Sequence, residues 1–169
     1  MAVVEKFLGK KVEVPDHLRY IAKQGFWAKA EDGQIIFGFT EPALVLAGGV
    51  SALDWLVPQG QRVSKGESIV FAITGKILYL EAPSDGPVHF NSVVKENPAL
   101  IAEDPYGKGW VFKIEPQTGA ENEFKQFTDV QGYVASLKTS EGFKNPDGLK
   151  GGVSGICKAV YTGIREQKL

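Results

Sequence analysis

The chain has 169 residues, which is enough for one domain with an appendage and a sizeable core. Hydrophobic residues make up 43% of it and charged residues 23%, and the formal net charge of -1 argues against a general attraction to nucleic acid or anionic membranes. The one cysteine, Cys157, excludes an internal disulfide and a cysteine-based zinc site. No segment has the apolar length of a signal peptide or a membrane span, so we expect a cytoplasmic protein.

The first third of the chain predicts one hairpin and one short helix. Residues 1–25 fit both a short helix and a strand. Residues 25–30 and 34–39 flank an Asp-Gly turn and predict a β-hairpin. Thr40 is a good N-cap for a helix that begins with Glu41-Pro42, and Gly48-Gly49 permits the left-handed exit.

The middle of the chain predicts a second hairpin around Thr74-Gly75-Lys76. Apolar runs at 69–73 and 77–80 are separated by Thr74-Gly75, so we expect a two-residue turn in which Lys76 is the first strand residue and pairs with Ile73. A lysine at such a tip is usually no more than a solvated charge. It can also carry a covalently attached acyl cofactor, because a hairpin tip projects the amine away from the protein.

The strands of this hairpin are predicted at 68–73 and 77–81, and further strands are predicted at 50–57, 88–91 and 110–114. Pro58-Gln59-Gly60 and Pro83-Ser84-Asp85-Gly86 flank the hairpin in a weak two-fold pattern. Two similar strand-turn units packed face to face would form a flattened barrel with the hairpin at one end. The high glycine and proline content agrees with this β-rich architecture, since both residues favour tight turns.

Beyond residue 117 the pattern becomes helical. Phe124, Phe127, Val130, Val134 and Leu137 recur at helical spacing and predict one helix over 121–138. A second helical stripe comprises Val153, Ile156, Val160 and Ile164. We therefore expect a division into residues 1–117 and a helical C-terminal extension, residues 118–169, packed on the first part or on a partner. Self-association through these helices is a further expectation.

Several motifs together resemble those of the H protein of the glycine cleavage system. The resemblance runs from Leu18 to Ile114, and its most specific part is the run from Asp104 to Ile114, DPYGKGWVFKI. The other matching motifs are Gly38-x-Thr40-Glu41, Pro58-x-Gly60, Val63-x-x-Gly66, Ala82-Pro83-x-x-Gly86, Asn91 and Asn97-Pro98.

The resemblance implies a lipoyl-domain-like flattened β-barrel (a barrel-sandwich hybrid) with short flanking helices. It implies a non-catalytic carrier with lipoate joined by an amide to Lys76 as N6-lipoyllysine. The implied partners are glycine decarboxylase, aminomethyltransferase and dihydrolipoyl dehydrogenase, between which the arm carries an aminomethyl group. The resemblance gives no role to nucleic acid, membrane or metal.

The hairpin tip departs from the family pattern. The family usually has Glu-Ser-Val-Lys-Ala, whereas this sequence has Ile73-Thr74-Gly75-Lys76-Ile77, and one residue is missing between Lys76 and Ala82-Pro83. The usual His-Glu-Trp of the first hairpin appears as Gly25-Phe26-Trp27. The alternative hypothesis is therefore an H-like protein that has lost lipoylation and acts as a structural or protein-interaction module. A biotin carrier is disfavoured by the absence of methionines beside Lys76, and an enzyme by the lack of a nucleophile-base pair.

Overall fold

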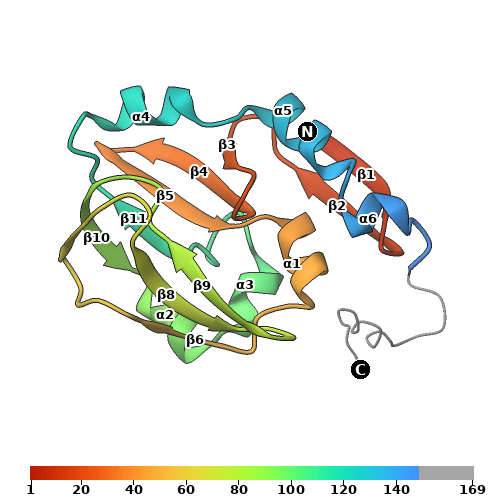
Figure 1. The fold of residues 1–169 in the computed structure, drawn as a ribbon, viewed down its shortest axis with the longest axis horizontal. Coiled ribbons are helices and arrows are strands. Elements are labelled where there is room, and N and C mark those ends of the chain that lie inside the picture. The colour runs from red at the N-terminus through yellow and green to blue at the C-terminus, as the bar shows by residue number, and fades with distance from the viewer. Residues whose placement is uncertain (149–169) are drawn as a thin grey trace.

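Strands form three antiparallel sheets in the part of the chain that the computed structural model describes, residues 1–148. A six-stranded sheet has the order β3-β4-β5-β11-β10-β7, a three-stranded sheet the order β6-β8-β9, and β1 pairs with β2 (Figure 1). The strands are β1 (Ala2–Phe7), β2 (Lys10–Val14), β3 (Arg19–Ile21), β4 (Phe26–Glu31), β5 (Gln34–Phe39), β6 (Ala52–Trp55), β7 (Arg62–Val63), β8 (Ser68–Ile73), β9 (Ile77–Glu81), β10 (Gly86–Phe90) and β11 (Phe112–Ile114). The helices are α1 (Glu41–Ala47), α2 (Ser92–Glu96), α3 (Ala99–Glu103), α4 (Ala120–Gln126), α5 (Val130–Leu137) and α6 (Glu141–Lys144). The mainly β architecture with short helices that the sequence predicts is confirmed.

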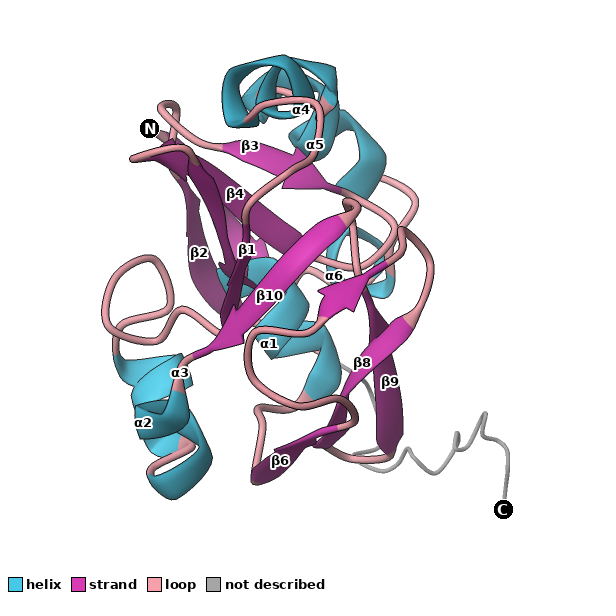
Figure 2. Ribbon diagram, turned by 90° about the vertical axis from the view of Figure 1, so that its left-hand side faces the viewer, coloured by secondary structure: helices cyan, strands magenta, loops and turns pink. Residues whose placement is uncertain are grey.

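The main core lies between the six-stranded and the three-stranded sheets. Phe37 and Phe112 of the first sheet are fully buried, and Val70, Ala72 and Leu80 of the second join the same cluster. Figure 2 shows the β8–β9 layer apart from the strands of the larger sheet. Alternate residues of each strand point inward, so the two sheets together form the flattened barrel.

Turn chemistry sets the positions of the first two hairpins. Asp32 and Gly33, between β4 and β5, both have positive φ (53° and 77°), as a two-residue hairpin turn requires. Leu8 and Gly9 do the same between β1 and β2, with φ of 52° and 77°. The ambiguous N-terminal residues are therefore strands.

Helix α1 begins and ends where the sequence predicts. The Thr40 hydroxyl accepts a hydrogen bond from the Ala43 N–H, and Gly48 adopts the left-handed conformation at the C-terminal end. Gly25 lies against this helix, and a Cβ on it would lie 2.5 Å from Cβ of Ala43. With a φ of 73° and this close approach, position 25 has no room for a side chain unless the neighbouring backbone shifts.

The prediction of one helix over 121–138 is wrong. Two helices, α4 and α5, occupy this range, and Thr128 between them pairs with Tyr20 of β3 through hydrogen bonds of 2.7 and 3.1 Å. Asp129 then caps α5 by accepting from the Gly132 N–H at 2.9 Å. The apolar residues recur at helical spacing throughout this range. The strand-like pairing of Thr128 and the N-cap at Asp129 nevertheless end one helix and begin another.

A second buried cluster joins these helices to the N-terminal strands. It contains Phe7 of β1, Tyr20 of β3, Trp27 of β4 and Tyr133 of α5. The rings of Tyr20 and Tyr133 stack at 4.6 Å. The outer face of the larger sheet is therefore covered by residues from both ends of the described chain. The predicted stripe from Val153 to Ile164 lies outside the described residues.

No helix within residues 1–148 is long and apolar enough to cross a membrane.

Candidate functional site

The β8–β9 hairpin has a three-residue tip. Ile73 pairs with Ile77, which leaves Thr74, Gly75 and Lys76 in the loop. The expected two-residue turn with Lys76 paired to Ile73 is therefore wrong. The physical reason is that Gly75 does not take the positive φ that a two-residue hairpin turn needs, and the loop is closed by side-chain hydrogen bonds instead. Lys76 thus projects from a loop and not from a strand.

This hairpin is one residue shorter than the family pattern, and a bulge at its base accommodates the difference. Ser68 pairs with Glu81 and Val70 with Leu80, so β8 has one more residue than β9 across a bulge at Ile69. From Val70 to the tip the pairing is regular. The bulge keeps Ala72 and Leu80 on the buried face, where a slip along the whole hairpin would have turned them outward.

Thr74 holds the backbone of Lys76 at both polar groups. Its N–H and its hydroxyl donate to the Lys76 carbonyl at 2.7 and 2.9 Å, and the Lys76 N–H lies 3.2 Å from the same hydroxyl oxygen. Hydroxyl side chains commonly close tight turns in this way. The backbone at the lysine is thereby fixed while its side chain stays exposed.

The tip is also attached to helix α1. The Gly75 N–H donates to the Ala47 carbonyl at 3.3 Å. At the other end of the helix, the Thr40 hydroxyl lies 2.6 Å from the Tyr133 hydroxyl, and the Glu41 N–H donates to the Tyr106 hydroxyl at 2.9 Å. A chain of hydrogen bonds therefore leads from the second buried cluster through α1 to the hairpin tip.

Among residues 1–148, no carboxylate pairs with the Lys76 amine. The five ion pairs found within residues 1–148 do not include it. Asp54 of the same sheet is paired with Lys95 at 2.7 Å, and this hydrogen bond holds the pKa of the Asp54 carboxyl below its usual value. Lys76 is thus an exposed primary amine at a fixed loop, chemically able to form an amide with an activated carboxylic acid.

Apolar side chains surround this lysine, a feature that the sequence analysis did not identify. Ile73, Ile77 and Tyr79 are 38%, 55% and 61% exposed. Phe71 pairs with Tyr79 and Ile73 with Ile77, so the four lie side by side on the outer face of the hairpin. The available signal was the period-two pattern of a strand: beyond the bulge at Ile69, the residues Ala72, Leu78 and Leu80 occupy the opposite face.

The motif most typical of the family has a structural role. Pro105 accepts a hydrogen bond from the Trp27 indole N–H at 2.7 Å, and the Tyr106 hydroxyl donates to the Glu13 carbonyl at 2.5 Å. Burial raises the pKa of Tyr106 above its usual range. A Cβ at Gly109 would lie 2.8 Å from the carbonyl oxygens of Leu100 and Asp104. The motif therefore positions α1 and β4 and does not line a reactive centre.

Within residues 1–148 no group of three or more His, Cys, Asp or Glu side chains could hold a metal ion. An exposed amine at a hairpin tip on a two-sheet barrel is suited to carrying a covalently attached group, and proteins that do so form a class of non-catalytic carriers.

Comparison with known proteins agrees with this class. The family model described as "Glycine cleavage H-protein" matches residues 18–140. Glycine cleavage system H protein 5 of Aquifex aeolicus is 40% identical over 108 residues, which cover 60% of this chain and 71% of that protein. A probable glycine cleavage system H protein 2 of Sulfurisphaera tokodaii is 34% identical over 134 residues, 76% of this chain and 87% of that one.

A solved structure shows the same fold. The crystal structure of a glycine cleavage system H protein from Mycobacterium marinum superposes with a TM-score of 0.60 at 28% identity, covering 72% of this chain and 97% of the other. This chain belongs to the glycine cleavage H-protein family, whose members are non-catalytic carrier proteins.

Proposed function

We propose that Lys76 is the lipoyl acceptor of this chain and that the chain carries a group on the lipoyl arm between partner enzymes. The observation that supports the proposal is an exposed lysine, in no ion pair with any of residues 1–148, in a three-residue tip whose backbone is held by Thr74. In the modification, the Lys76 amine attacks an activated lipoyl carboxyl, an amide bond forms and the activating group leaves. The family typically carries lipoate, and no other residue of the β8–β9 tip offers an amine.

The proposed partners follow from the family. They are glycine decarboxylase, which loads an aminomethyl group onto the oxidised arm, aminomethyltransferase, which removes it, and dihydrolipoyl dehydrogenase, which reoxidises the dithiol. Tethering makes each encounter between arm and partner site effectively intramolecular once the two proteins dock. The chain itself needs only the arm and a docking surface.

Reconstitution with a glycine decarboxylase tests the carrier function. The lipoylated chain is expected to support exchange of labelled bicarbonate into the glycine carboxyl group, and the Lys76→Arg variant is expected not to. Lys65→Arg, at an exposed lysine away from the tip, is the matched control and should retain exchange. Equal exchange with Lys76→Arg would refute the proposal.

A second candidate function is favoured by Ile73. The family usually has a glutamate at this position, which helps modifying enzymes recognise the hairpin, and here the position is an exposed isoleucine. An H-like interaction module without lipoate would accept such a change at no functional cost. This candidate predicts a chain that stays unmodified in a lipoylating host and associates with itself or a partner equally well after Lys76→Arg, as sedimentation velocity would measure.

A further inference from the structure

Strand β9 forms an open edge of the three-stranded sheet, because β8 is the one strand within residues 1–148 that pairs with it. The Thr74 N–H donates to the Lys76 carbonyl, so the backbone groups of Lys76 face across the hairpin. Since backbone groups point to alternate sides along an antiparallel strand, the N–H and C=O groups of Ile77 and Tyr79 point away from β8. No hydrogen bond joins these four groups to another part of residues 1–148.

The base of this edge is closed, whereas the part near the tip is accessible. The Glu81 N–H, the next one to point outward, donates to the Gln24 side chain at 2.8 Å. Lys23 and Gln24 line a groove with residues 78–81, and this groove runs beside the edge. A strand from another molecule can therefore reach Ile77 and Tyr79 without displacing a hydrogen-bond partner within residues 1–148.

The other sheet edges of the barrel are protected, as edge strands usually are. In the six-stranded sheet, Thr128 pairs with β3 at one edge, and β7 at the other edge has only two residues. In the three-stranded sheet, the other edge strand, β6, carries Asp54, which forms an ion pair with Lys95 at 2.7 Å. Residues 77–80 of β9 include no charged residue, proline or glycine. This edge is therefore the one best suited to strand pairing.

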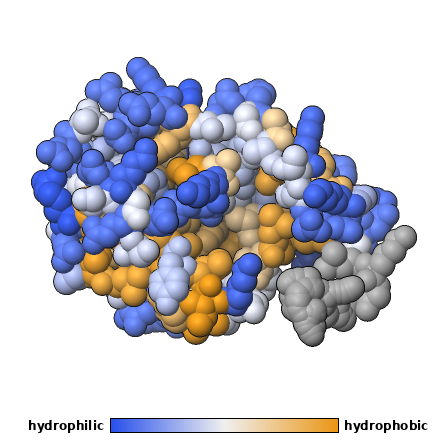
Figure 3. All heavy atoms as spheres, in the orientation of Figure 1, coloured by the Kyte–Doolittle hydropathy of each residue, from blue (hydrophilic) through white to orange (hydrophobic). Residues whose placement is uncertain are grey.

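The outer face of the same hairpin is apolar. The rings of Phe71 and Tyr79 meet edge to face at 5.8 Å, and Ile73 and Ile77 pair beside them. Apolar side chains gather at the surface over this part of the molecule (Figure 3). Exposed apolar surfaces of this kind often mark protein contacts. A strand that is added to β9 would extend this surface beyond the edge.

We propose that β9 pairs with β9 of a second copy of this chain, antiparallel and about a two-fold axis at Leu78, and that this pairing restricts the access of enzymes to Lys76. In this register Ile77 lies opposite Tyr79 of the second copy, and Tyr79 lies opposite Ile77 of the second copy. All of their outward N–H and C=O groups then form hydrogen bonds. The edge is thus complementary to itself, as a two-fold interface requires, which favours a second copy over an unrelated segment.

The side chains agree with this register. Leu78 meets Leu78 of the second copy on the inner face, and Tyr79 meets Ile77 of the second copy on the outer face. Glu81 lies opposite Gly75 of the second copy, next to Lys76, so unlike charges approach at both ends of the paired strands. The pairing itself is independent of lipoylation, whereas its consequence for access to Lys76 rests on the proposed function.

A disulfide tests the register. Leu78→Cys in a Cys157→Ser background places one thiol of each copy at the two-fold axis. Directly opposed Cα atoms of this kind lie about 4.5 Å apart, which a disulfide can span. Oxidised glutathione, which is reduced as the two thiols are oxidised, is expected to give mainly linked dimer.

Tyr79→Cys in the same background is the matched control. The two copies of position 79 are offset by two residues, about 7 Å along the strands, so this variant should stay mainly monomeric. Tyr79 is 61% exposed and Leu78 is half-buried, so random collisions would favour the opposite result. Equal or stronger cross-linking at position 79 would overturn the proposal.

The parent chain provides a test without new cysteines. Sedimentation velocity should show a dimer fraction that rises between micromolar and millimolar concentrations, as a small interface predicts. Amide hydrogen exchange of Ile77 and Tyr79 should slow over the same series, whereas that of Leu78, whose N–H points to β8, should not change. Tyr79→Pro, which removes one outward N–H, should lower the dimer fraction.

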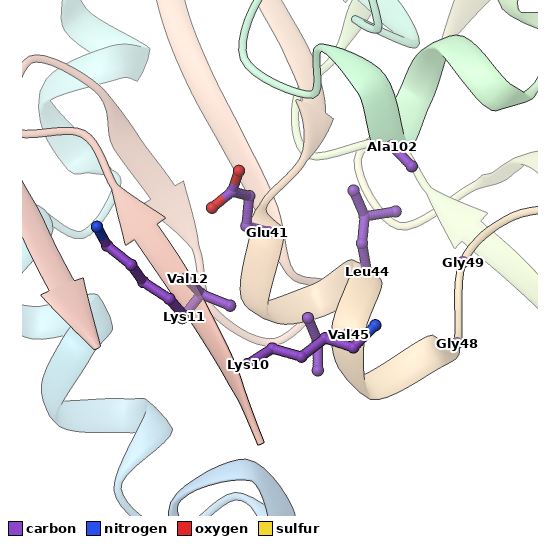
Figure 4. A pocket seen from close by; sticks show the side chains of 9 residues that line it. All are labelled: Lys10, Lys11, Val12, Glu41, Leu44, Val45, Gly48, Gly49 and Ala102. Carbon is purple, nitrogen blue, oxygen red and sulfur yellow. The ribbon is translucent and has the colours of Figure 1, made fainter. Parts of the chain in front are cut away.

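The groove between β2 and α1 offers a control surface on the far side of α1 from the hairpin (Figures 1 and 4). Lys10→Glu, in this groove, should dimerise like the parent chain. A parent chain that stays monomeric at millimolar concentration would overturn the proposal.

The effect on Lys76 is measured separately. The disulfide-linked Leu78→Cys dimer is expected to be lipoylated several-fold more slowly than the same variant after reduction, and equal rates would refute the restriction of access. None of the measurements of pairing needs a lipoylated chain, so a failure of the pairing and a failure of the proposed function are distinguishable.

Discussion

The hydroxyl of Thr74 holds both backbone polar groups of Lys76, lying 2.9 Å from its carbonyl oxygen and 3.2 Å from its N–H nitrogen. These contacts close the loop without a glycine in the left-handed conformation. The loop backbone is therefore already ordered before a modifying enzyme binds, so less conformational entropy of the loop is lost on binding.

Thr74→Val removes these hydrogen bonds while keeping the branched shape of the side chain. A net contribution of about 1 kcal/mol for a hydrogen bond corresponds to a fivefold effect, so we expect kcat/KM for lipoylation to fall about fivefold to tenfold, mainly through KM. Thr74→Ser should restore it. The free energy of unfolding in urea should fall by no more than about 1 kcal/mol, since Lys76 and Gly75 are exposed and Thr74 is only half-buried. An equal loss with Thr74→Ser would contradict a positioning role for this hydroxyl.

Tyr133→Phe is expected to destabilise the fold. The Tyr133 hydroxyl lies 2.6 Å from the hydroxyl of Thr40, which is fully buried and also caps α1. Removing one partner of a buried pair costs about 1–3 kcal/mol. Urea unfolding measures this loss, and a free energy of unfolding equal to that of the parent would show that the contact does not stabilise the protein.

Stability should fall at alkaline pH. Burial raises the pKa of Tyr133 from 10.0 to about 12 and also raises the pKa values of Tyr20 and Tyr106. The folded state therefore holds these protons more tightly than the unfolded state. The stabilisation is complete below the unfolded pKa of 10 and is lost as the pH rises through the folded values, at up to about 1.4 kcal/mol per pH unit for each group.

Urea unfolding at a series of pH values from about 9 to about 12 measures this decline. Tyr133→Phe should make the decline shallower because it removes one of the three tyrosines whose pKa is raised. A free energy of unfolding that stays constant over this range would contradict the burial of these hydroxyls.

Gly142→Ala should also destabilise the chain. A Cβ at Gly142 of α6 would lie 2.3 Å from ring atoms of Phe7, which is fully buried. Overpacking of this kind costs about 1–3 kcal/mol. Gly75→Ala is the matched control, because its Cβ would make only an ordinary contact at 3.7 Å with the Ala47 carbonyl. Equal stability of the two variants would argue against close packing of α6 on β1.

The sequence predicted the elements that local chemistry determines. Asp32-Gly33 specifies its turn through backbone conformation, and Thr40 with Gly48 specifies both ends of α1. The strands of the β8–β9 hairpin follow from short apolar runs bounded by turn residues, and the structure gives 68–73 and 77–81 as predicted.

Features that depend on distant residues were not predictable from such patterns. The break between α4 and α5 arises because Thr128 pairs with Tyr20, more than a hundred residues earlier in the chain. The three-residue tip is closed by Thr74 and contacts Ala47 of α1, and the register of the hairpin includes a bulge at Ile69. The sequence identified Lys76 as the candidate lipoyl acceptor. Its position in the loop became known only from the strand register in the structure.

The intact mass of the protein tests the identity of the acceptor most directly. The chain is produced in a host with lipoate ligase and supplied lipoate, beside the Lys76→Arg and Lys65→Arg variants. We expect the parent chain and Lys65→Arg to gain the mass of one lipoyl group and Lys76→Arg to gain none. An unmodified parent chain, or an adduct that persists in Lys76→Arg, would contradict the assignment of Lys76 as the lipoyl acceptor.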